Sequence, residues 1–258
     1  MGMVSNQQDM PAPINIPSEL IDALINARTV TVLTGAGISA ESGIPTFRDA
    51  QSGLWSAYRP EELATPQAFQ RDPKLVWEWY TWRRDLINRA EPNPGHDSLV
   101  IMETRIQDFC LVTQNVDGLH QRAGSKNVLE LHGNIHRSRC FREGVLVSSA
   151  ETKGDSPPKC PGCGSYLRPD VVWFGESLSE DTLRQAWETV NQCDLFFSIG
   201  TSALVHPAAA LPEIAHRSGA KVVEININRT PLTQKATYFL QGSAALVLPL
   251  ILRSSWPE

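Results

Sequence analysis

Short, continuous apolar runs alternate with stretches of helical spacing along most of this chain. Apolar runs of this length are typical of strands that are buried on both faces, as in parallel sheets. Strands are predicted from residue 30 and over 108–113, 128–134, 194–199, 221–227 and 245–249, and helices over 18–25, from about Ser39, and over 73–88, 96–104 and 208–218. This alternation predicts an α/β fold built on a parallel sheet.

A glycine-rich turn follows the first predicted strand. Gly35, Gly37 and Ala40 match the pattern G-x-G-x-x-G/A, which joins a strand to a helix in dinucleotide-binding folds. The first glycine permits a tight turn, the second lets the backbone approach a pyrophosphate, and the small third residue permits close packing of helix and strand. Glycine pairs after strands are also common in ordinary turns, so the pattern alone leaves both interpretations open.

Polar side chains follow several of the predicted strands. They are Gln114, Asn115 and Asp117, then Thr201 and Ser202 after Gly200, then Asn226 and Asn228. Ligands of open α/β sheets bind at the carboxyl ends of strands, and neutral donors and acceptors suit ribose hydroxyls and adenine. His132 also lies at a strand end, beside a glycine that leaves its imidazole approachable. A lone histidine is more often structural, and we interpret the other histidines as structural or surface residues.

Composition narrows the class of protein. The 258 residues carry a formal net charge of −5 with a pI near 5.7, and 41% are hydrophobic. The lack of a dense Lys/Arg block argues against a nucleic-acid partner. No apolar run reaches the length of about 18 residues that a membrane span needs. The polar start, 1–17, is predicted to be a flexible lead-in without secretory or transit features, so we expect a cytoplasmic protein that binds no membrane.

The cysteines point to a small inserted module. There are five, an odd number that argues against a disulfide framework. Two of them, Cys110 and Cys193, adjoin apolar runs and are interpreted as buried small hydrophobic residues. The other three lie in a segment rich in charge, glycine, serine and proline that interrupts the alternation of strands and helices.

This segment contains an incomplete metal motif. Cys160 and Cys163, in the turn CPGC, form half of a zinc ribbon. Cys140 would begin the other half, but Glu143 stands where a fourth cysteine would complete the set. Three thiolates and a carboxylate can bind Zn²⁺, and they are equally compatible with the remnant of a lost site.

Seven motifs together point to one protein family. In chain order they are GAGISAESGIPTFRD, TQNVDGLH, LHGN, CPGC, RPDVVWFGE, GTS and NIN. On these motifs the chain resembles the sirtuins over nearly its full length. The resemblance implies one domain, 1–258, in which a Rossmann-type parallel sheet carries a smaller zinc-ribbon-like and helical module. The expected partition is 18–44, 96–134 and 171–258 for the Rossmann-type part, 45–95 for a cofactor loop and helical module, and 135–170 for the zinc-ribbon-like module.

The resemblance also implies a reaction that consumes NAD⁺. In sirtuins the acyl-lysine carbonyl oxygen attacks C1′ of the nicotinamide ribose and displaces nicotinamide, and collapse with water gives lysine and 2′-O-acyl-ADP-ribose. His132 is implied as the general base on a ribose hydroxyl, with Asn115 and Asp117 as further catalytic residues. An imidazole suits this role because its pKa lies close to neutral pH.

Residues for the cofactor, the peptide and the metal are implied in the same way. Around NAD⁺ the resemblance implies Gly35, Ala36, Gly37, Ser39, Pro45, Phe47, Arg48, Gln114, Asn115, Asp117, Gly200, Thr201, Ser202, Asn226, Asn228 and Ala244. It implies Val172, Trp173 and Phe174 as the segment that pairs with the backbone of the acyl-lysine protein or peptide. The metal ligands would be Cys140, Cys160 and Cys163, with Glu143 as a fourth.

Tyr80 and Arg83 add an expectation about the acyl group. They match the Tyr-x-x-Arg pair of class III sirtuins, which remove succinyl, malonyl and glutaryl groups, and residues at i and i+3 share one helix face. A guanidinium can bind a carboxylate through two hydrogen bonds while the phenol adds another. Without the family motifs, a surface arginine beside a core tyrosine is the simpler interpretation. With them, the sequence predicts a deacylase for acidic acyl groups that also removes acetyl groups.

Two other functions are compatible with the same sequence motifs. Mono-ADP-ribosyl transfer would move part of NAD⁺ onto a protein, and a non-catalytic module would bind NAD or a peptide without turnover. The intact His132, Asn115 and Asp117 argue against the second of these. A dehydrogenase is disfavoured because no acidic residue follows the second strand in position for a ribose 2′-hydroxyl. The oligomeric state does not follow from the sequence.

Overall fold

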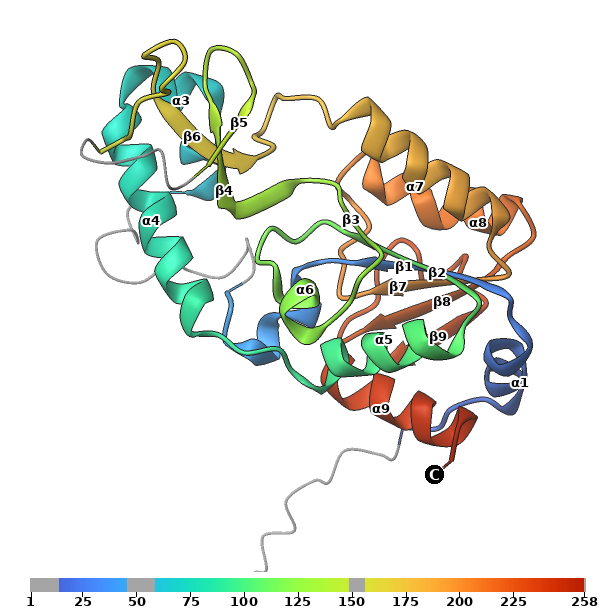
Figure 1. The fold of residues 1–258 in the computed structure, drawn as a ribbon. Helices are drawn as coiled ribbons and strands as arrows, with labels where there is room; N and C mark the ends of the chain where they lie inside the picture. The colour runs from blue at the N-terminus through green and yellow to red at the C-terminus, as the bar shows by residue number, and fades with distance from the viewer. Residues whose placement is uncertain (1–13, 46–58, 149–155, 258) are drawn as a thin grey trace, which may run out of the picture.

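The larger part of the fold is a parallel sheet. The computed structural model describes residues 14–45, 59–148 and 156–257 (Figure 1). Within these ranges six parallel strands pair in the order β3-β2-β1-β7-β8-β9. They are β1 (Thr29–Thr34), β2 (Asp108–Thr113), β3 (Val128–Glu130), β7 (Leu195–Ile199), β8 (Lys221–Asn226) and β9 (Tyr238–Gln241). The strand order reverses between β1 and β7, which is the switch point where Rossmann-type sheets bind ligands.

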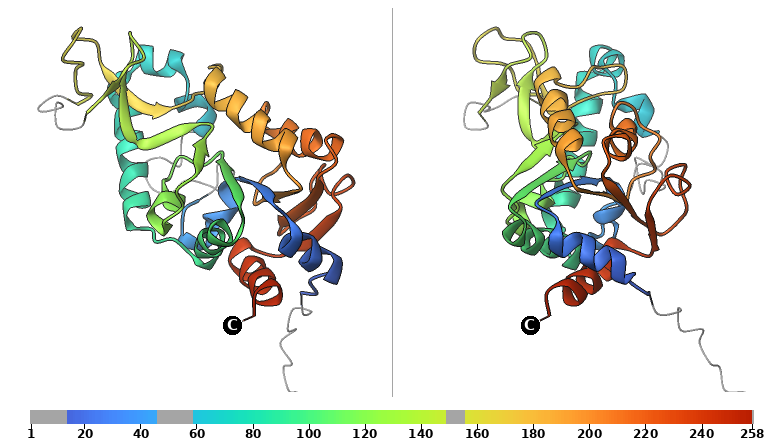
Figure 2. Two further views of the ribbon diagram at one scale, coloured as in Figure 1. Left: turned by 45° about the vertical axis from the view of Figure 1, so that its right-hand side comes forward. Right: turned by 90° about the vertical axis from the view of Figure 1, so that its right-hand side faces the viewer.

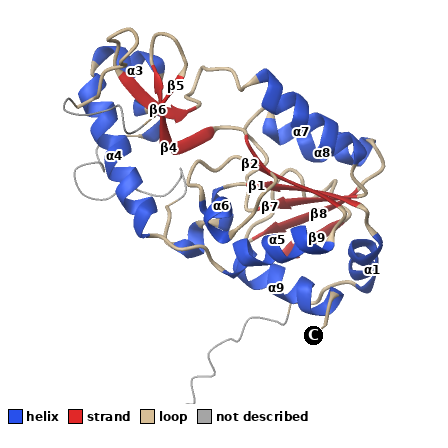
Figure 3. Cartoon of the chain, in the orientation of Figure 1, coloured by secondary structure: helices blue, strands red, loops and turns tan. Residues whose placement is uncertain are grey.

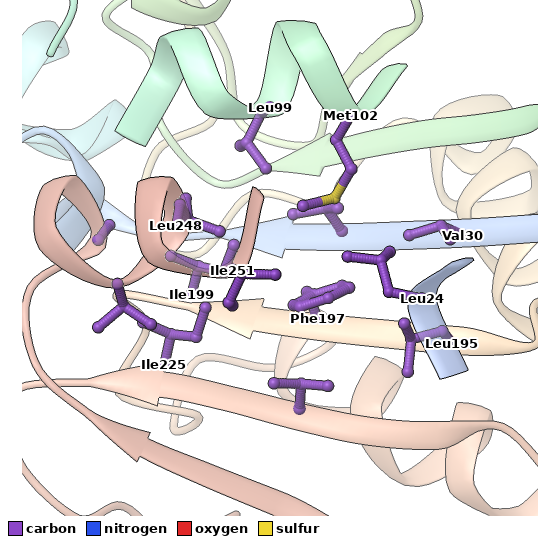
Figure 4. Packing of buried hydrophobic residues seen from close by; sticks show 14 of the residues in the cluster. Leu24, Val30, Leu99, Met102, Leu195, Phe197, Ile199, Ile225, Leu248 and Ile251 are labelled. Atoms are coloured by element: carbon purple, nitrogen blue, oxygen red, sulfur yellow. The ribbon is translucent and has the colours of Figure 1, made fainter. Parts of the chain in front are cut away.

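Helices cover both faces of this sheet (Figures 1 and 3). On one face lie α1 (Ser18–Asn26), α5 (Pro94–Arg105) and α9 (Ala244–Ser255), and on the other lie α7 (Glu180–Gln192) and α8 (Leu211–Arg217). Successive strand residues point to opposite faces, so in β1 Val32 packs into the first layer and Leu33 into the second. Figure 4 shows Leu248 and Ile251 of α9 lying over Phe197 and Ile199 of β7.

The smaller part combines helices with a three-stranded antiparallel sheet (Figure 2). Among the described residues its elements are α2 (Pro60–Leu63), α3 (Pro66–Arg71), α4 (Pro73–Arg89), β4 (Gly133–Cys140), β5 (Leu146–Val147) and β6 (Leu167–Val171). The aromatic helix α4 begins where the Asp72 side chain accepts a hydrogen bond from the Leu75 N–H (3.0 Å) and proline takes the first turn. Trp79 and Tyr80 of α4 pack with Phe69 and Trp173 in a separate core.

Three sequence predictions about secondary structure need correction. The strand predicted over 128–134 consists of the end strand β3 and the start of β4, which belong to different sheets and are separated by Leu131 and His132. The predicted strand over 245–249 is wrong, because these residues lie within helix α9 and the last strand is β9. A short apolar run does not distinguish a buried strand from a buried helix, which explains the error. The helix predicted from about Ser39 consists of two 3₁₀ turns, η1 (Ala36–Ile38) and η2 (Ala40–Ser42), and ends at Gly43 with a φ of +81°.

A short helix, α6 (Leu119–Ala123), follows the segment after β2. No helix in the described part of the chain is both long and apolar enough to cross a membrane.

Candidate active site and metal site

Three glycines bring the ends of β1 and β7 into direct backbone contact. The Gly35 N–H donates to the Ile199 carbonyl oxygen (3.0 Å), and the Gly37 N–H donates to that of Gly200 (2.8 Å). A Cβ on Gly37 would lie 2.6 Å from Gly200 Cα, and one on Gly35 would lie 2.8 Å from Gly200 O, so neither position has room for a side chain. The close approach leaves bare backbone at the switch point, as binding of a pyrophosphate requires.

A buried hydrogen-bond network links this turn to the segment after β2. Asn115 Nδ2 donates to Gly35 O (3.1 Å) and to Ser39 Oγ (3.2 Å), and the Ser39 hydroxyl donates to Asp117 Oδ2 (2.7 Å). The other Asp117 oxygen accepts the Leu119 N–H (2.9 Å). Burial raises the pKa of Asp117, and these two hydrogen bonds oppose the rise. The network therefore fixes Asn115 and Asp117 at the switch point.

Residues at the ends of three strands are connected on the other side of the turn. Gln114 Nε2 donates to Thr201 Oγ1 (3.0 Å), and Asn226 Nδ2 donates to the Thr201 carbonyl oxygen (2.8 Å). Ser202 is half-buried beside Thr201, whereas Asn228 is exposed beyond β8. The structure thus joins the ends of β2, β7 and β8 through neutral amides and a hydroxyl.

His132 follows β3 and is held from two sides. Its Nδ1 lies 2.9 Å from the Gln114 carbonyl oxygen, and its own carbonyl accepts the Val172 N–H (2.9 Å). Because a carbonyl oxygen can only accept, Nδ1 carries the proton and Nε2 keeps its lone pair. Burial lowers the pKa of His132, and the bond to Gln114 opposes this. The imidazole is therefore neutral near pH 7, with Nε2 able to accept a proton.

The segment 172–174 follows β6 and lies beside His132. The Trp173 N–H donates to Glu176 Oε2 (2.8 Å), and the Phe174 N–H donates to the Ala64 carbonyl oxygen (2.9 Å). Together with the Val172–His132 bond, these contacts occupy all three backbone N–H groups of the segment. A peptide strand added here would meet carbonyl oxygens rather than N–H donors. Trp173 is buried, whereas Phe174 is 47% exposed.

Tyr80 and Arg83 lie one turn apart on α4. Tyr80 is 2% exposed, and its hydroxyl oxygen accepts a hydrogen bond from Trp173 Nε1 (2.8 Å). Burial raises the pKa of Tyr80 to about 12 against the opposing charge of Arg83. The Arg83 guanidinium stands 5.2 Å from the centre of the Trp79 ring. Burial lowers the pKa of Arg83, and the neighbouring Tyr80 and Asp117 oppose this fall.

Two histidines without a clear sequence signal are buried beside the site. The rings of His96 and His120 lie 5.0 Å apart, and His120 Nε2 lies 2.9 Å from Thr34 Oγ1. The Thr34 hydroxyl donates to Thr113 Oγ1 (2.8 Å), which also accepts the Asn115 N–H (3.0 Å). His120 lies within the motif TQNVDGLH, which was the available signal for it. The pair is thereby connected to the network of Asn115.

The cysteine segment forms two similar turns. The Gly144 N–H donates to Cys140 O (2.9 Å), and the Gly164 N–H donates to Cys160 O (2.8 Å), so Glu143 corresponds to Cys163. Ligand atoms of Cys140, Glu143, Cys160 and Cys163 all lie within 4.8 Å of one another. This donor set fits tetrahedral Zn²⁺, which accepts thiolate and carboxylate ligands. The four residues could hold zinc at the end of the smaller part, away from His132.

Comparison with protein families matches residues 35–207 to the Sir2 family. The matched segment includes the glycine turn, the network of Asn115 and Asp117, and His132. This chain belongs to the Sir2 family. Sir2 proteins are the sirtuins, so the family expected from the motifs is confirmed.

Curated relatives of this Sir2 protein are named as deacylases. It is 54% identical over 217 residues to the NAD-dependent protein deacylase of Aquifex aeolicus, across 84% of this chain and 90% of the relative. It is 47% identical over 246 residues to NAD-dependent protein deacylase 1 of Pseudomonas aeruginosa, across 92% of this chain and 98% of the relative. These relationships support NAD-dependent protein deacylase activity for this chain.

Solved Sir2 structures share the whole fold. A Sir2 homolog in complex with NAD has 46% sequence identity and a TM-score of 0.87, with 94% of each chain covered. A complex of Sir2 with a p53 peptide and NAD⁺ has 34% identity and a TM-score of 0.81, with 92% of this chain and 97% of the other covered. The α/β fold class with a Rossmann-type sheet and a smaller module is therefore confirmed.

The predicted cofactor residues occupy different parts of the site. Ala36 begins η1, Pro45 is exposed where the described part of the loop ends, and Ala244 is the buried first residue of α9. Phe47 and Arg48 lie outside the described residues. The bare glycine turn, the neutral groups at the strand ends and the neutral His132 fit NAD⁺, although the roles of individual residues stay predictions.

Proposed function

We propose that this protein removes succinyl and malonyl groups, and also acetyl groups, from protein lysines. The reaction would consume NAD⁺ and release nicotinamide and 2′-O-acyl-ADP-ribose. Membership of the Sir2 family supports NAD-dependent deacylation. The observation that supports the acyl preference is the pair Tyr80 and Arg83, which lie one turn apart on α4.

The environment of this pair favours a negatively charged acyl group. Burial lowers the pKa of Arg83, which means that loss of water disfavours its charge. A carboxylate at the end of the acyl chain would compensate through charge-assisted hydrogen bonds, whereas an acetyl group would not. Tyr80, with a pKa of about 12, stays protonated and remains a donor. A hydrogen bond to a charged group is worth about 1.5–3 kcal/mol, or about 10- to 150-fold in specificity.

We assign the NAD⁺ side of the reaction to the switch point. The turn at Gly35 and Gly37 would lie against the pyrophosphate, and Asn115 and Asp117 against the nicotinamide ribose. Bound NAD⁺ supplies a ribose carbon that carries a good leaving group. His132 would take the proton of a ribose hydroxyl at Nε2, because its bond to the Gln114 carbonyl keeps the other proton on Nδ1.

The test compares two peptides that differ only in the acyl group. Purified protein is incubated with acetyl-lysine and succinyl-lysine peptides of one sequence, with and without NAD⁺, and free lysine and nicotinamide are quantified. We expect turnover of both peptides only with NAD⁺. The substitution Arg83→Met should lower kcat/KM for the succinyl peptide about 10- to 150-fold and change that for the acetyl peptide much less. Equal losses on the two peptides would refute the assignment of Arg83.

Arg84 provides a matched control on the same helix. Its guanidinium stacks on Trp77, 4.6 Å from the ring centre, and donates to Thr81 Oγ1 (3.2 Å), so it is engaged on α4 itself. Arg84→Met should therefore leave the ratio of the two activities unchanged. Radiolabel that moves from NAD⁺ onto protein, without release of free lysine, would instead favour mono-ADP-ribosyl transfer.

A further inference from the structure

The hydroxyl of Tyr80 makes an unusual set of contacts for a buried phenol. Trp173 Nε1 donates to it, and an indole N–H can only donate, so the Tyr80 oxygen is the acceptor in this bond. Its own proton must therefore point elsewhere. Within the described part of the chain no acceptor for that proton is present. A buried donor without a partner is costly, so binding of a ligand acceptor at this position would be favourable.

Trp173 is itself held by a partly buried ion pair between Arg168 and Glu176. The Arg168 guanidinium lies against the Trp173 ring, with Cζ 3.3 Å from the ring centre. Arg168 donates to both oxygens of Glu176 (2.5 and 2.9 Å) and to the Val171 carbonyl (2.5 Å). One Glu176 oxygen also accepts the Trp173 backbone N–H (2.8 Å). We call Arg168, Trp173 and Glu176 the indole clamp.

The indole clamp fixes the direction of the Tyr80 proton. A phenolic hydrogen lies near the ring plane because the oxygen is conjugated with the ring, which leaves two orientations. The Trp173 N–H lies against one side of the oxygen, so the hydrogen is directed to the other. Arg83 lies on the next turn of α4 with its charge near Tyr80. We therefore expect the Tyr80 donor and the Arg83 guanidinium to contact the same negatively charged group.

We propose that Trp173 is a positioning residue for acyl selectivity, which orients the Tyr80 hydroxyl toward the carboxylate of an acidic acyl group. This inference rests on the proposed preference for acidic acyl groups. Trp173 contacts no acyl carboxylate in this scheme and acts through Tyr80. The Val172–His132 bond next to it places the indole clamp beside the general base, so one short segment orders both groups.

The test is a double-mutant cycle on the ratio of kcat/KM for succinyl peptide over acetyl peptide. Trp173→Phe removes the indole donor and keeps an aromatic ring, and it should lower this ratio about tenfold, mainly through a higher KM for the succinyl peptide. Tyr80→Phe should lower the ratio at least as much. In the Tyr80→Phe background, Trp173→Phe should change the ratio less than about twofold, because the group that it orients is gone.

Two further variants keep the outcome interpretable if Trp173→Phe folds poorly. Glu176→Gln weakens the indole clamp without removing the indole, and it should also lower the ratio of succinyl to acetyl activity. In the Tyr80→Phe background, Glu176→Gln should leave this ratio unchanged. Phe69→Leu is the packing control, because the Phe69 ring lies 5.3 Å from that of Trp173 and carries no polar group. It should affect both peptides equally.

The failures of the two proposals are distinguishable. Additive losses in the cycle, or a Trp173→Phe variant that slows both peptides equally as Phe69→Leu does, would overturn the role of Trp173 alone. The acidic-acyl preference, and this inference with it, would be overturned by two results together. The wild type would show equal kcat/KM for the two peptides, and Arg83→Met would leave that ratio unchanged.

Discussion

The buried histidine pair predicts that the protein loses stability in mild acid. His96 is fully buried and His120 is 1% exposed. Burial lowers the pKa of His96 from 6.5 to about 4, and burial together with the charge of His96 lowers that of His120 to about 3. Between pH 6.5 and these values the unfolded chain binds protons that the folded chain does not, so the free energy of unfolding falls as the pH falls.

The size of the effect follows from these values. A pH of 5 is about 1.5 units below 6.5, the pKa of a histidine in the unfolded chain. Each unit corresponds to about 1.4 kcal/mol, which gives a loss of about 2 kcal/mol per histidine. Both rings stay neutral at pH 5, so the pair costs about 4 kcal/mol relative to pH 7.5. Domains are commonly stable by only 5–15 kcal/mol, so this loss is readily measurable.

The assay is urea denaturation at pH 7.5 and pH 5 for the wild type and His96→Gln. Glutamine at the third helical position of α5 can still accept the Asn93 N–H that His96 Nδ1 accepts (3.2 Å). The raised pKa of Asp117 opposes the effect of the histidines, so the difference between the two proteins is the informative quantity. The variant should lose about 2 kcal/mol less on acidification.

A control and a refuting result complete this experiment. His216 is exposed on α8, so His216→Gln removes an imidazole without disturbing the pair. That variant should follow the wild type at both pH values. If His96→Gln shows the same loss as the wild type between pH 7.5 and 5, burial does not hold His96 neutral and the reasoning fails.

The other predictions concern His132 and the cysteine segment. His132→Asn should lower both deacylase activities about 100-fold or more, because Nε2 would be lost as a base. The far-UV circular dichroism of this variant should match that of the wild type. Near-wild-type turnover would show that His132 is not the general base. The cysteine segment should hold about one zinc ion per chain by elemental analysis, and Cys160→Ser should lose it and unfold at lower temperature. Glu143→Cys should slow metal release to a chelator, because a fourth thiolate replaces a carboxylate; faster release would contradict this.

The strands of the larger sheet were predictable because their residues are apolar on both faces. The bounds of β2 match the prediction, and those of β7 and β8 differ from it by one residue. The glycine turn and His132 were also predictable, since Gly35 directly follows β1 and His132 lies two residues after β3. Helix α9 was not, because nine apolar residues of the kind found at 244–252 fit either a strand or a helix buried against the sheet.

Contacts between segments that are distant in the chain could not be predicted from the sequence. Trp173 and Tyr80 are 93 residues apart, and nothing in either local pattern predicts that an indole donates to the phenol. The histidine pair is similar: His96 looks like an ordinary residue near a helix start, and its burial depends on how α5 packs beside α6. In each case the decisive property is what the fold brings against a side chain, which periodicity does not report.

The segment after β2 joins the two chemical halves of the site. Its residues Val116 and Leu119 pack into the core that contains Tyr80, while Asp117, between them, turns the other way to bind Ser39 near the glycine turn. Asp117 also opposes the fall in the pKa of Arg83 that burial causes. Under the proposed function, an acyl carboxylate bound by Arg83 would lie close to the segment that also carries Asp117. We therefore expect recognition of the acyl group and placement of NAD⁺ to be coupled through this one segment.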